Sequence, residues 1–190
     1  MIFASNNQNK IVEIKNIFKE YNIKSLKDLN INIDIEENGQ SFYENALIKA
    51  KAIYELTKRP TIADDSGLIF EELVDYPGIN TKRIEKIAKK EGLTRNEFLI
   101  KKGQSLKNKN IVAICNLVYY DGNKIISSEG TMSGIITDKE YPGNGFGFDS
   151  IFQLNNGKIV SQLSQEEKNK ISHRYNACIK LKEKLDKYIK

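Results

Sequence analysis

Two adjacent carboxylates, Asp64 and Asp65, follow a short apolar run near the middle of the chain. Ile62 and Ala63 precede them and Gly67 follows. We expect a buried strand that ends at the acidic pair, because glycine accommodates the positive φ or the close backbone approach of a sharp strand end. Neighbouring carboxylates repel each other, so burying both favours a shared proton or cation, and a divalent metal ion would meet this need. The alternative is an Asp-Ser-Gly turn in a hairpin.

A second acidic pair, Glu36 and Glu37, lies just before a predicted helix. Residues 30–35 alternate between polar and apolar, which predicts a half-buried strand that ends at these glutamates. Ser41 and Glu44 have the spacing of a capping box, which opens a helix that stops before Pro60. The two glutamates are either metal ligands or, as is more common for this residue type, solvated loop residues.

A polar loop at residues 5–10 separates a short predicted strand, residues 2–4, from a helix whose apolar positions begin at Ile11. The free amides and the positive dipole end of such a helix bind phosphate readily, and Lys10 adds a full charge. The spacing of a P-loop is absent. The alternative is a helix capped by asparagine, beside a solvated lysine.

A glycine-rich segment, residues 142–152, contains Phe146 and Phe148 ahead of Asp149. Glycines let the backbone lie against a flat ligand, and an aromatic ring offers stacking worth about 1 to 3 kcal/mol per nucleobase. The alternative is a glycine-rich turn whose phenylalanines belong to the core, which is the assignment we make for Phe152.

His173 is the only histidine, and we expect it with Arg174 on the first turn of a closing helix that Ser172 caps. A single histidine excludes metal sites that need several histidines. It also excludes a serine–histidine triad built on any other histidine.

Further elements are predicted around these residues. Residues 111–120 and 124–137 are rich in β-branched and aromatic residues and are joined by Asp121-Gly122-Asn123, which predicts a β-hairpin. A Pro77-Gly78 turn leads into a helical pattern at residues 84–88. A helix at residues 94–102 should stop at Gly103, and the closing helix carries an apolar stripe as far as residue 188.

Composition limits the possible classes of protein. The chain has 190 residues, enough for one large domain or two small lobes, with 39% hydrophobic and 29% charged residues and a net charge of +5. These values suit a globular protein that binds small anions, and also permit weak nucleic-acid contact. Cys115 and Cys178 are far apart and have no metal-ligand spacing, which predicts a reduced, cytoplasmic setting. The first residues predict no signal peptide, and the longest apolar run is too short for a membrane span.

Taken together, these segments resemble the inosine triphosphate pyrophosphatase family, also called Ham1-like, in order and spacing over nearly the whole chain. The matching motifs are Ser5-Asn6-Asn7-Gln8-Asn9-Lys10; Glu36-Glu37-Asn38-Gly39 with Phe42, Glu44, Asn45 and Ala46; Ala63-Asp64-Asp65-Ser66-Gly67-Leu68; Pro77-Gly78-Ile79 with Arg83; Gly145-Phe146-Gly147-Phe148-Asp149; and Glu167-Lys168 with Ser172-His173-Arg174 and Ala177.

The resemblance implies a single Ham1-like domain over residues 1–190, of the α/β class. Its long mixed sheet would be flanked by helices, with two lobes around a nucleotide cleft, usually in a cytoplasmic homodimer. The implied reaction is hydrolysis of ITP, dITP and XTP to the monophosphate and pyrophosphate, which removes deaminated purines from the nucleotide pool. No nucleic-acid or membrane partner is expected.

The resemblance also implies roles for individual residues. Asp65 would accept the proton, and Asp65 with Glu37 would hold Mg²⁺, with Glu36 as the alternative second ligand and Asp64 or Glu36 as supporting carboxylates. Lys10 and Lys168 would balance the triphosphate charge. Phe148 would stack on the base, and Asp149, His173 and Arg174 would address its edge. The full set of implied substrate contacts is Ser5, Asn6, Asn7, Gln8, Asn9, Lys10, Ser66, Phe146, Gly147, Phe148, Asp149, Lys168, His173 and Arg174.

The sequence departs from the family pattern at Asn6, at Asn80-Thr81 and at Phe148, which affects specificity more than chemistry. Asparagine tolerates the left-handed conformation, so the first loop can keep its shape. Phe148 keeps a stacking face and lacks a polar atom. Two alternatives remain: a related pyrophosphatase that acts on modified pyrimidines or standard dNTPs, and a basic nucleic-acid-binding module.

Overall fold

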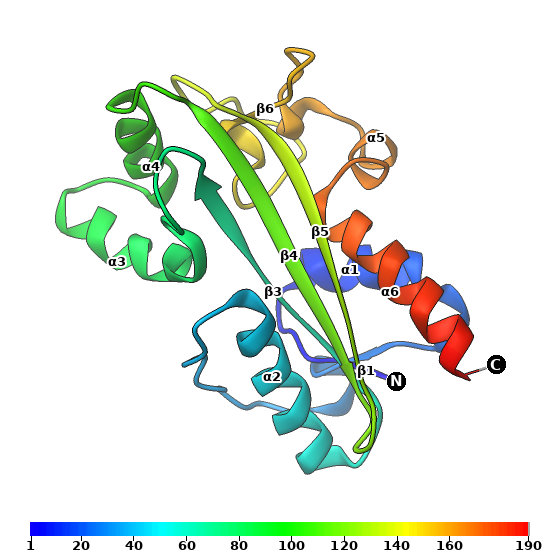
Figure 1. Cartoon of the computed structure of the whole chain (residues 1–190). Helices are drawn as coiled ribbons and strands as arrows, with labels where there is room; N and C mark the ends of the chain where they lie inside the picture. Colours follow the sequence, from blue (N-terminus) through cyan, green and yellow to red (C-terminus); the bar gives the residue numbers. More distant parts are fainter. Residues whose placement is uncertain (190) are drawn as a thin grey trace. The chain divides into compact units, whose positions relative to one another are not determined.

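The chain forms a mixed α/β structure around a six-stranded sheet. The computed structural model describes residues 1–189 and leaves aside the side chain of Lys82. The strands are ordered β2-β1-β3-β4-β5-β6 (Figure 1). Their bounds are β1 Ile2–Phe3, β2 Lys24–Ser25, β3 Thr61–Phe70, β4 Asn110–Tyr120, β5 Ile125–Ile136 and β6 Phe152–Gln153. Strand β1 is parallel to β2 and β3, whereas β5 and β6 are antiparallel, so the sheet is mixed.

Helices connect and flank these strands, as the α/β fold class predicts. Their bounds are α1 Gln8–Ile17, α2 Phe42–Thr57, α3 Thr81–Lys90, α4 Arg95–Gln104, α5 Gln165–Asn169 and α6 His173–Ile189. Within residues 1–189, no helix has both the length and the apolar composition needed to cross a membrane.

The chain divides into two compact units, and each has its own hydrophobic core. The first unit comprises Met1–Ser66, Cys115–Gly130 and His173–Lys190, and the second comprises Gly67–Ile114 and Thr131–Ser172. The first contains two clusters of buried residues, one including Phe3, Ile14 and Leu181 and the other including Ala46 and Ile53. The second contains a cluster that includes Phe70, Leu99 and Phe152, so Phe152 belongs to the core as predicted.

Strand β3 does not end at the acidic pair. It continues through Asp64, Asp65, Ser66 and Gly67 to Phe70 and is buried along almost its whole length. The expected sharp strand end, and the hairpin turn that was its alternative, are therefore both wrong. A strand with neighbours on both sides keeps its hydrogen-bond ladder through polar residues when their side chains find partners.

Residues 31–39 have no regular secondary structure, so the strand predicted at 30–35 is absent. Ile31 and Ile35 nevertheless pack against the cluster that contains Ala46 and Ile53. The alternation thus predicted the partial burial of Ile31 and Ile35, whereas Ile33 is exposed. It did not produce a strand, because β2 forms the edge of the sheet and Asn30, in the left-handed conformation, redirects the chain.

The other predicted elements are present with small changes at their ends. Ser41 caps α2 by accepting from the Glu44 amide, and β4 and β5 are joined at the predicted Asp121-Gly122-Asn123 turn. Helix α4 runs one residue beyond Gly103, which is not its stop. A Cβ at Gly103 would lie 2.5 Å from the Ile136 side chain, so glycine is needed there for close packing.

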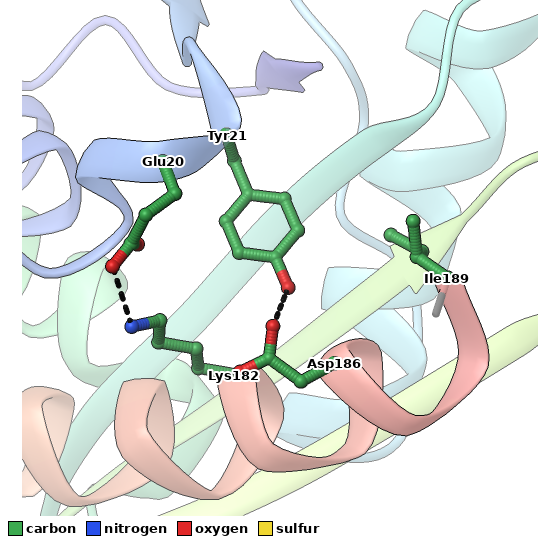
Figure 2. Close-up of a pocket in the computed structure, with 5 residues that line it drawn as sticks. All are labelled: Glu20, Tyr21, Lys182, Asp186 and Ile189. Atoms are coloured by element: carbon green, nitrogen blue, oxygen red, sulfur yellow. Dashed lines mark hydrogen bonds and ion pairs between the residues drawn. The ribbon is translucent and has the colours of Figure 1, made fainter.

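Helix α6 is held at both ends by contacts inside the first unit. Near its start, the Ser128 hydroxyl of β5 donates to the Ala177 carbonyl, 2.7 Å away. Near its end, the Tyr21 hydroxyl donates to Asp186 and Lys182 pairs with Glu20, around an open pocket of about 300 Å³ (Figure 2). Burial, with Asp186, raises the pKa of Tyr21 to about 12. These contacts fix the helix that carries His173 and Arg174.

We expect Gly130→Ala to destabilise the first unit strongly. A Cβ at Gly130 would lie 2.2 Å from the His173 carbonyl oxygen and 2.3 Å from the Ala177 nitrogen, so β5 and the first turn of α6 would have to separate. Forced overpacking of this kind costs about 1 to 3 kcal/mol. The free energy of unfolding, measured with urea, checks the prediction. The control is Ser133→Ala, at an exposed position of the same strand, and equal stability of both variants would contradict this packing.

Candidate functional site

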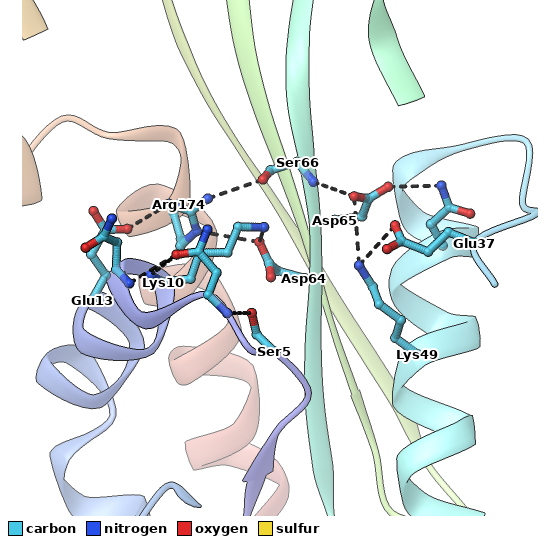
Figure 3. Close-up of polar contacts among 12 residues, drawn as sticks. Ser5, Lys10, Glu13, Glu37, Lys49, Asp64, Asp65, Ser66 and Arg174 are labelled. Atoms are coloured by element: carbon cyan, nitrogen blue, oxygen red, sulfur yellow. Dashed lines mark hydrogen bonds and ion pairs between the residues drawn. The ribbon is translucent and has the colours of Figure 1, made fainter. Parts of the chain in front are cut away.

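Asp64 and Asp65 project from opposite faces of β3 (Figure 3). Successive side chains of a strand alternate between its two faces, and the strand continues through both residues. The two carboxylates therefore do not share one cation as the sequence suggested. Each has its own set of partners, all of them in the first unit.

The Asp64 carboxylate is buried between two cations. Lys10 Nζ lies 2.8 Å from its Oδ2, and Arg174 Nε lies 3.6 Å from the same atom. Burial alone would raise the pKa of Asp64, but the attraction of Lys10 and Arg174 outweighs it and lowers this pKa. Lys10 and Arg174 thus favour the ionised form of Asp64. Lys10 is engaged by Asp64 and is not the solvated lysine that one alternative predicted.

Arg174 lies on the first turn of α6, as predicted, but its guanidinium is buried and bound within the first unit. Nη1 is 2.7 Å from Glu13 Oε2 on α1, and Nη2 is 3.2 Å from the Ser66 hydroxyl. The guanidinium therefore connects α1, β3 and α6. Sequence reasoning missed Glu13. The available signal was a charged residue at a position of α1 between the buried Ile11 and Ile14.

The Asp65 carboxylate faces α2 and is held in a fixed orientation. Asn45 Nδ2 donates to its Oδ2 at 3.0 Å, and the backbone N–H of Ser66 donates to its Oδ1 at 3.0 Å. Burial is the main cause that raises the pKa of Asp65, while Lys49 and Asn45 oppose this shift and Glu37 and Asp64 add to it. A buried carboxylate with a raised pKa is a stronger base than an exposed aspartate.

Lys49 of α2 joins Asp65 to Glu37. Its Nζ lies 3.2 Å from Glu37 Oε2 and 3.9 Å from Asp65 Oδ1 (Figure 3). Sequence reasoning missed both Lys49 and the contact of Asn45. Asn45 and Lys49 lie four residues apart and therefore on one face of α2. Because Asn45 belongs to a matched motif, this spacing could have indicated that Lys49 lies at the same site.

Glu37 and Asp65 fit a magnesium ion better than a metal that needs a complete protein cage. No cluster of three or more potential ligands occurs among the described His, Cys, Asp and Glu residues. Mg²⁺ typically binds through one or two carboxylates and takes its other ligands from water and substrate phosphates. Lys49 already occupies a cation position between the two carboxylates. Of the two glutamates left open by the sequence, Glu37 approaches Asp65, and Glu36 is exposed.

The first loop has the asparagine cap that one interpretation of the sequence predicted, and its phosphate-binding role stays a prediction. Asn7 caps α1, and its side chain accepts from the amides of Asn9 and Lys10. The Ser5 hydroxyl accepts from the Asn7 amide at 3.2 Å. Asn6, Gln8 and Asn9 are exposed. The loop is therefore a capped helix start with Lys10 directed to Asp64, and it lies on the same side of β3 as Arg174 (Figure 3).

The glycine-rich segment forms a second group, in the second unit. Asp149 Oδ2 accepts from the Phe146 amide at 2.7 Å and from Lys168 Nζ at 2.6 Å, and all three residues are brought together. Lys168 also lies over the Phe146 ring, 4.1 Å from its centroid. Lys168 thus contacts two of the predicted base-binding residues, Phe146 and Asp149. Gly145 is required here, because a Cβ would lie 2.4 Å from Asp149.

The structure thus distributes the predicted site residues over both units. The first unit contains Lys10, Glu37, Asp64, Asp65, Ser66 and Arg174, connected by the contacts above, and also the half-buried His173 at the start of α6. The second contains Phe146, Gly147, Phe148, Asp149 and Lys168.

Comparison with known proteins identifies relatives over nearly the full length. A dITP/XTP pyrophosphatase of Borreliella burgdorferi is 40% identical over 96% of this chain and 94% of its own length, and one of Aquifex aeolicus is 37% identical over 95% and 94%. Among solved structures, the Ham1 protein of Staphylococcus aureus aligns with a TM-score of 0.85 and 34% identity, covering 98% of both chains. The profile of the Ham1 family matches residues 1–184, and the chain belongs to the Ham1 family.

Proposed function

We propose that this chain is a nucleoside triphosphate pyrophosphatase that hydrolyses dITP, ITP and XTP to the monophosphate and pyrophosphate. The observation that carries the proposal is the group formed by Asp65, Glu37 and Lys49, in which an oriented, buried carboxylate lies beside a second carboxylate and a cation. Relatives with the name dITP/XTP pyrophosphatase, about 40% identical, support the choice of substrate.

Asp65 is the residue we assign to accept the proton of the attacking water. Asn45 and the Ser66 amide hold its two oxygens in a fixed orientation, which lowers the entropic cost of proton transfer. Its raised pKa suits a general base, because the strength of a base increases with its pKa. Protonation of Asp65 would weaken its attraction for the Lys49 ammonium group. The freed ammonium group would then be available to a phosphate oxygen.

Glu37 and Asp65 are the residues we assign to Mg²⁺. Ham1-family pyrophosphatases generally depend on a divalent metal ion. The group of Glu37, Asp65 and Lys49 contains two carboxylates and one ammonium, so its formal charge is −1 when all three are ionised. Bound Mg²⁺ would neutralise phosphate charge and acidify a water ligand.

The remaining contacts divide between the triphosphate and the base. We assign Ser5, Asn6, Asn7, Gln8, Asn9, Lys10 and Ser66 to the phosphates and ribose, because they adjoin the start of α1 and Asp64. Phe146, Gly147, Phe148, Asp149 and Lys168 are assigned to the base, with His173 at its edge. We also propose that the protein forms a homodimer and is located in the cytoplasm.

The experiment that tests the function measures pyrophosphate release from ITP, dITP, XTP, GTP, ATP and dUTP, with Mg²⁺ and with EDTA. We expect turnover of ITP, dITP and XTP, weak turnover of ATP and dUTP, and loss of all turnover in EDTA. Preference for dUTP would support the pyrimidine-specific alternative instead. Release of inorganic phosphate without pyrophosphate would contradict cleavage between the α and β phosphates.

Asp65→Asn should abolish turnover of ITP while the fold stays intact. The amide keeps the volume of the carboxylate but can neither accept the proton nor contribute charge to the metal, and general bases typically contribute 10² to 10⁴ in rate. Turnover and melting temperature are measured together. A variant that keeps more than about a tenth of the wild-type rate would disprove the assigned role.

Two glutamate variants provide the matched comparison for the metal ligands. Glu37→Gln should raise the Mg²⁺ concentration needed for half-maximal activity, because Glu37 lies beside Lys49 and Asp65. Glu36→Gln is the control, since Glu36 is the exposed neighbour in the same loop. Equal Mg²⁺ dependence of the two variants would remove Glu37 from the proposed metal site.

Arg174→Ala tests two roles for this residue. The sequence predicts donors for the 6-keto edge of the base, which would make the loss of kcat/KM selective for ITP over ATP. The contacts with Glu13, Asp64 and Ser66 favour a role in positioning Asp64, which predicts an equal loss for both substrates. They also predict destabilisation of about 3 to 5 kcal/mol, because buried carboxylates lose their partner.

We expect the equal loss. The measurements are kcat/KM for ITP and for ATP at one Mg²⁺ concentration, and the free energy of unfolding. Arg174→Lys is the conservative comparison and should recover part of the stability, because it restores a positive charge without the fork that joins Glu13 to Ser66. A loss confined to ITP, with stability unchanged, would assign Arg174 to the base.

A further inference from the structure

Arg95, the first residue of α4, lies over the Phe148 ring. The carbon at the centre of its guanidinium is 4.6 Å from the ring centroid. This is a cation–π contact, which is attractive when the planar cation faces the ring. One face of the Phe148 ring is therefore covered by Arg95. A base that stacks on Phe148 would have to contact the opposite face of the ring.

The position of Arg95 is costly by ordinary criteria. A cation on the first turn of a helix opposes the helix dipole. The Nε atom is buried and has no hydrogen-bond partner among the described residues. Burial lowers the pKa of Arg95, and Glu85 and Glu140 oppose this shift through charge alone. Unfavourable buried polar groups tend to occur where function requires them, so the contact of Arg95 with the Phe148 ring calls for an explanation.

Asn96, the next residue, fixes the relative position of Arg95 and Phe148. Its Nδ2 atom donates to the Gly147 carbonyl, the Ser150 hydroxyl and Glu140, each at 3.1 Å. Gly147 has a φ of +70°, a conformation that favours glycine, and the backbone turns there just before Phe148. The start of α4 and the segment 147–150 thus form one connected structure, with the Arg95 side chain against the ring.

We propose that Arg95 is a positioning residue of the nucleobase site, which supports the rear face of Phe148 so that the front face is fixed for stacking by a purine. The inference rests on the proposed function and adds to it a residue outside the glycine-rich segment. Phe148 has no polar atom, so only packing holds its ring, and the contact with Arg95 adds to the packing of Phe148 against the core cluster of the second unit. A guanidinium whose central carbon is 4.6 Å from the ring centroid restricts the motion of the ring, and the cation draws electron density away from the face that a purine would meet.

The test separates binding of the base from binding of the phosphates. Inhibition of ITP hydrolysis is measured with inosine, which carries only the base and ribose, and with pyrophosphate, which carries only phosphates. For Arg95→Ala we expect KM for ITP and the inhibition constant of inosine to rise about tenfold, with kcat and inhibition by pyrophosphate nearly unchanged. A positioning residue gives this pattern because it acts only through Phe148.

Two further variants identify the property of Arg95 that matters. Arg95→Gln keeps a planar group without charge, and Arg95→Lys keeps the charge without a plane. Partial recovery of inosine inhibition by Arg95→Gln, and less by Arg95→Lys, would support restriction of the ring plane. Lys102→Ala is the matched control, because Lys102 lies over the Tyr76 ring from the same helix, 5.7 Å from its centroid, and should leave both inhibition constants unchanged.

The outcomes that overturn the inference are distinct. A rise confined to pyrophosphate inhibition would make Arg95 a phosphate contact. Unchanged inosine inhibition in a folded Arg95→Ala variant would mean that the contact with Phe148 is only structural. If the wild-type protein cleaves none of the purine triphosphates, the proposed function fails. If it cleaves ITP and Arg95→Ala keeps the wild-type KM, this inference alone fails.

Discussion

The alternation of side chains along β3 determines the arrangement of charge in the first unit. Because Asp64 and Asp65 are consecutive in one continuous strand, their carboxylates must face opposite sides. Each then needs separate compensation. The Asp64 side receives Lys10 and Arg174, and the Asp65 side receives Lys49. The placement of α1, α6 and α2 follows from this requirement, since these helices carry the cations.

The two carboxylates have opposite electrostatic character although they are neighbours. Cations surround Asp64 closely enough to lower its pKa, whereas burial dominates at Asp65 and raises it. Environments that move two adjacent pKa values apart are typical of sites where one carboxylate stays charged and the other exchanges protons. These opposite shifts support the proposed division of roles, in which Asp64 stays charged beside Lys10 and Arg174 and Asp65 exchanges the proton.

The sequence predicted most of the elements, because apolar periodicity and caps are local signals. Ser41 caps α2 through its hydroxyl group, as its motif with Glu44 predicts. The strand end at Gly67 and the strand at 30–35 were wrong. In both cases a local pattern was compatible with two structures, and the position of neighbouring strands in the sheet decided between them.

Candidate site residues could be predicted where they belong to a sequence motif. Their contact partners from distant segments of the chain were harder to predict. Asp65 and Glu37 were identified from the sequence, and Lys49 was not, because a lysine on a helix is usually solvated. Glu13 and Arg174 are separated by 160 residues of chain, and nothing in either segment specifies the pair. The contact between Arg95 and Phe148 could not be predicted for the same reason, because the two residues lie far apart in the sequence.

Lys49 has a consequence for the choice of ion. With no metal bound, its ammonium group already neutralises part of the charge on Glu37 and Asp65. An ion bound by both carboxylates would compete with this ammonium group, so its affinity would be the difference between two pairings. A monovalent cation would exchange one unit charge for another and gain little, whereas a divalent ion gains a full charge. A single lysine can thereby make the carboxylates discriminate against potassium and sodium without a rigid cage of ligands.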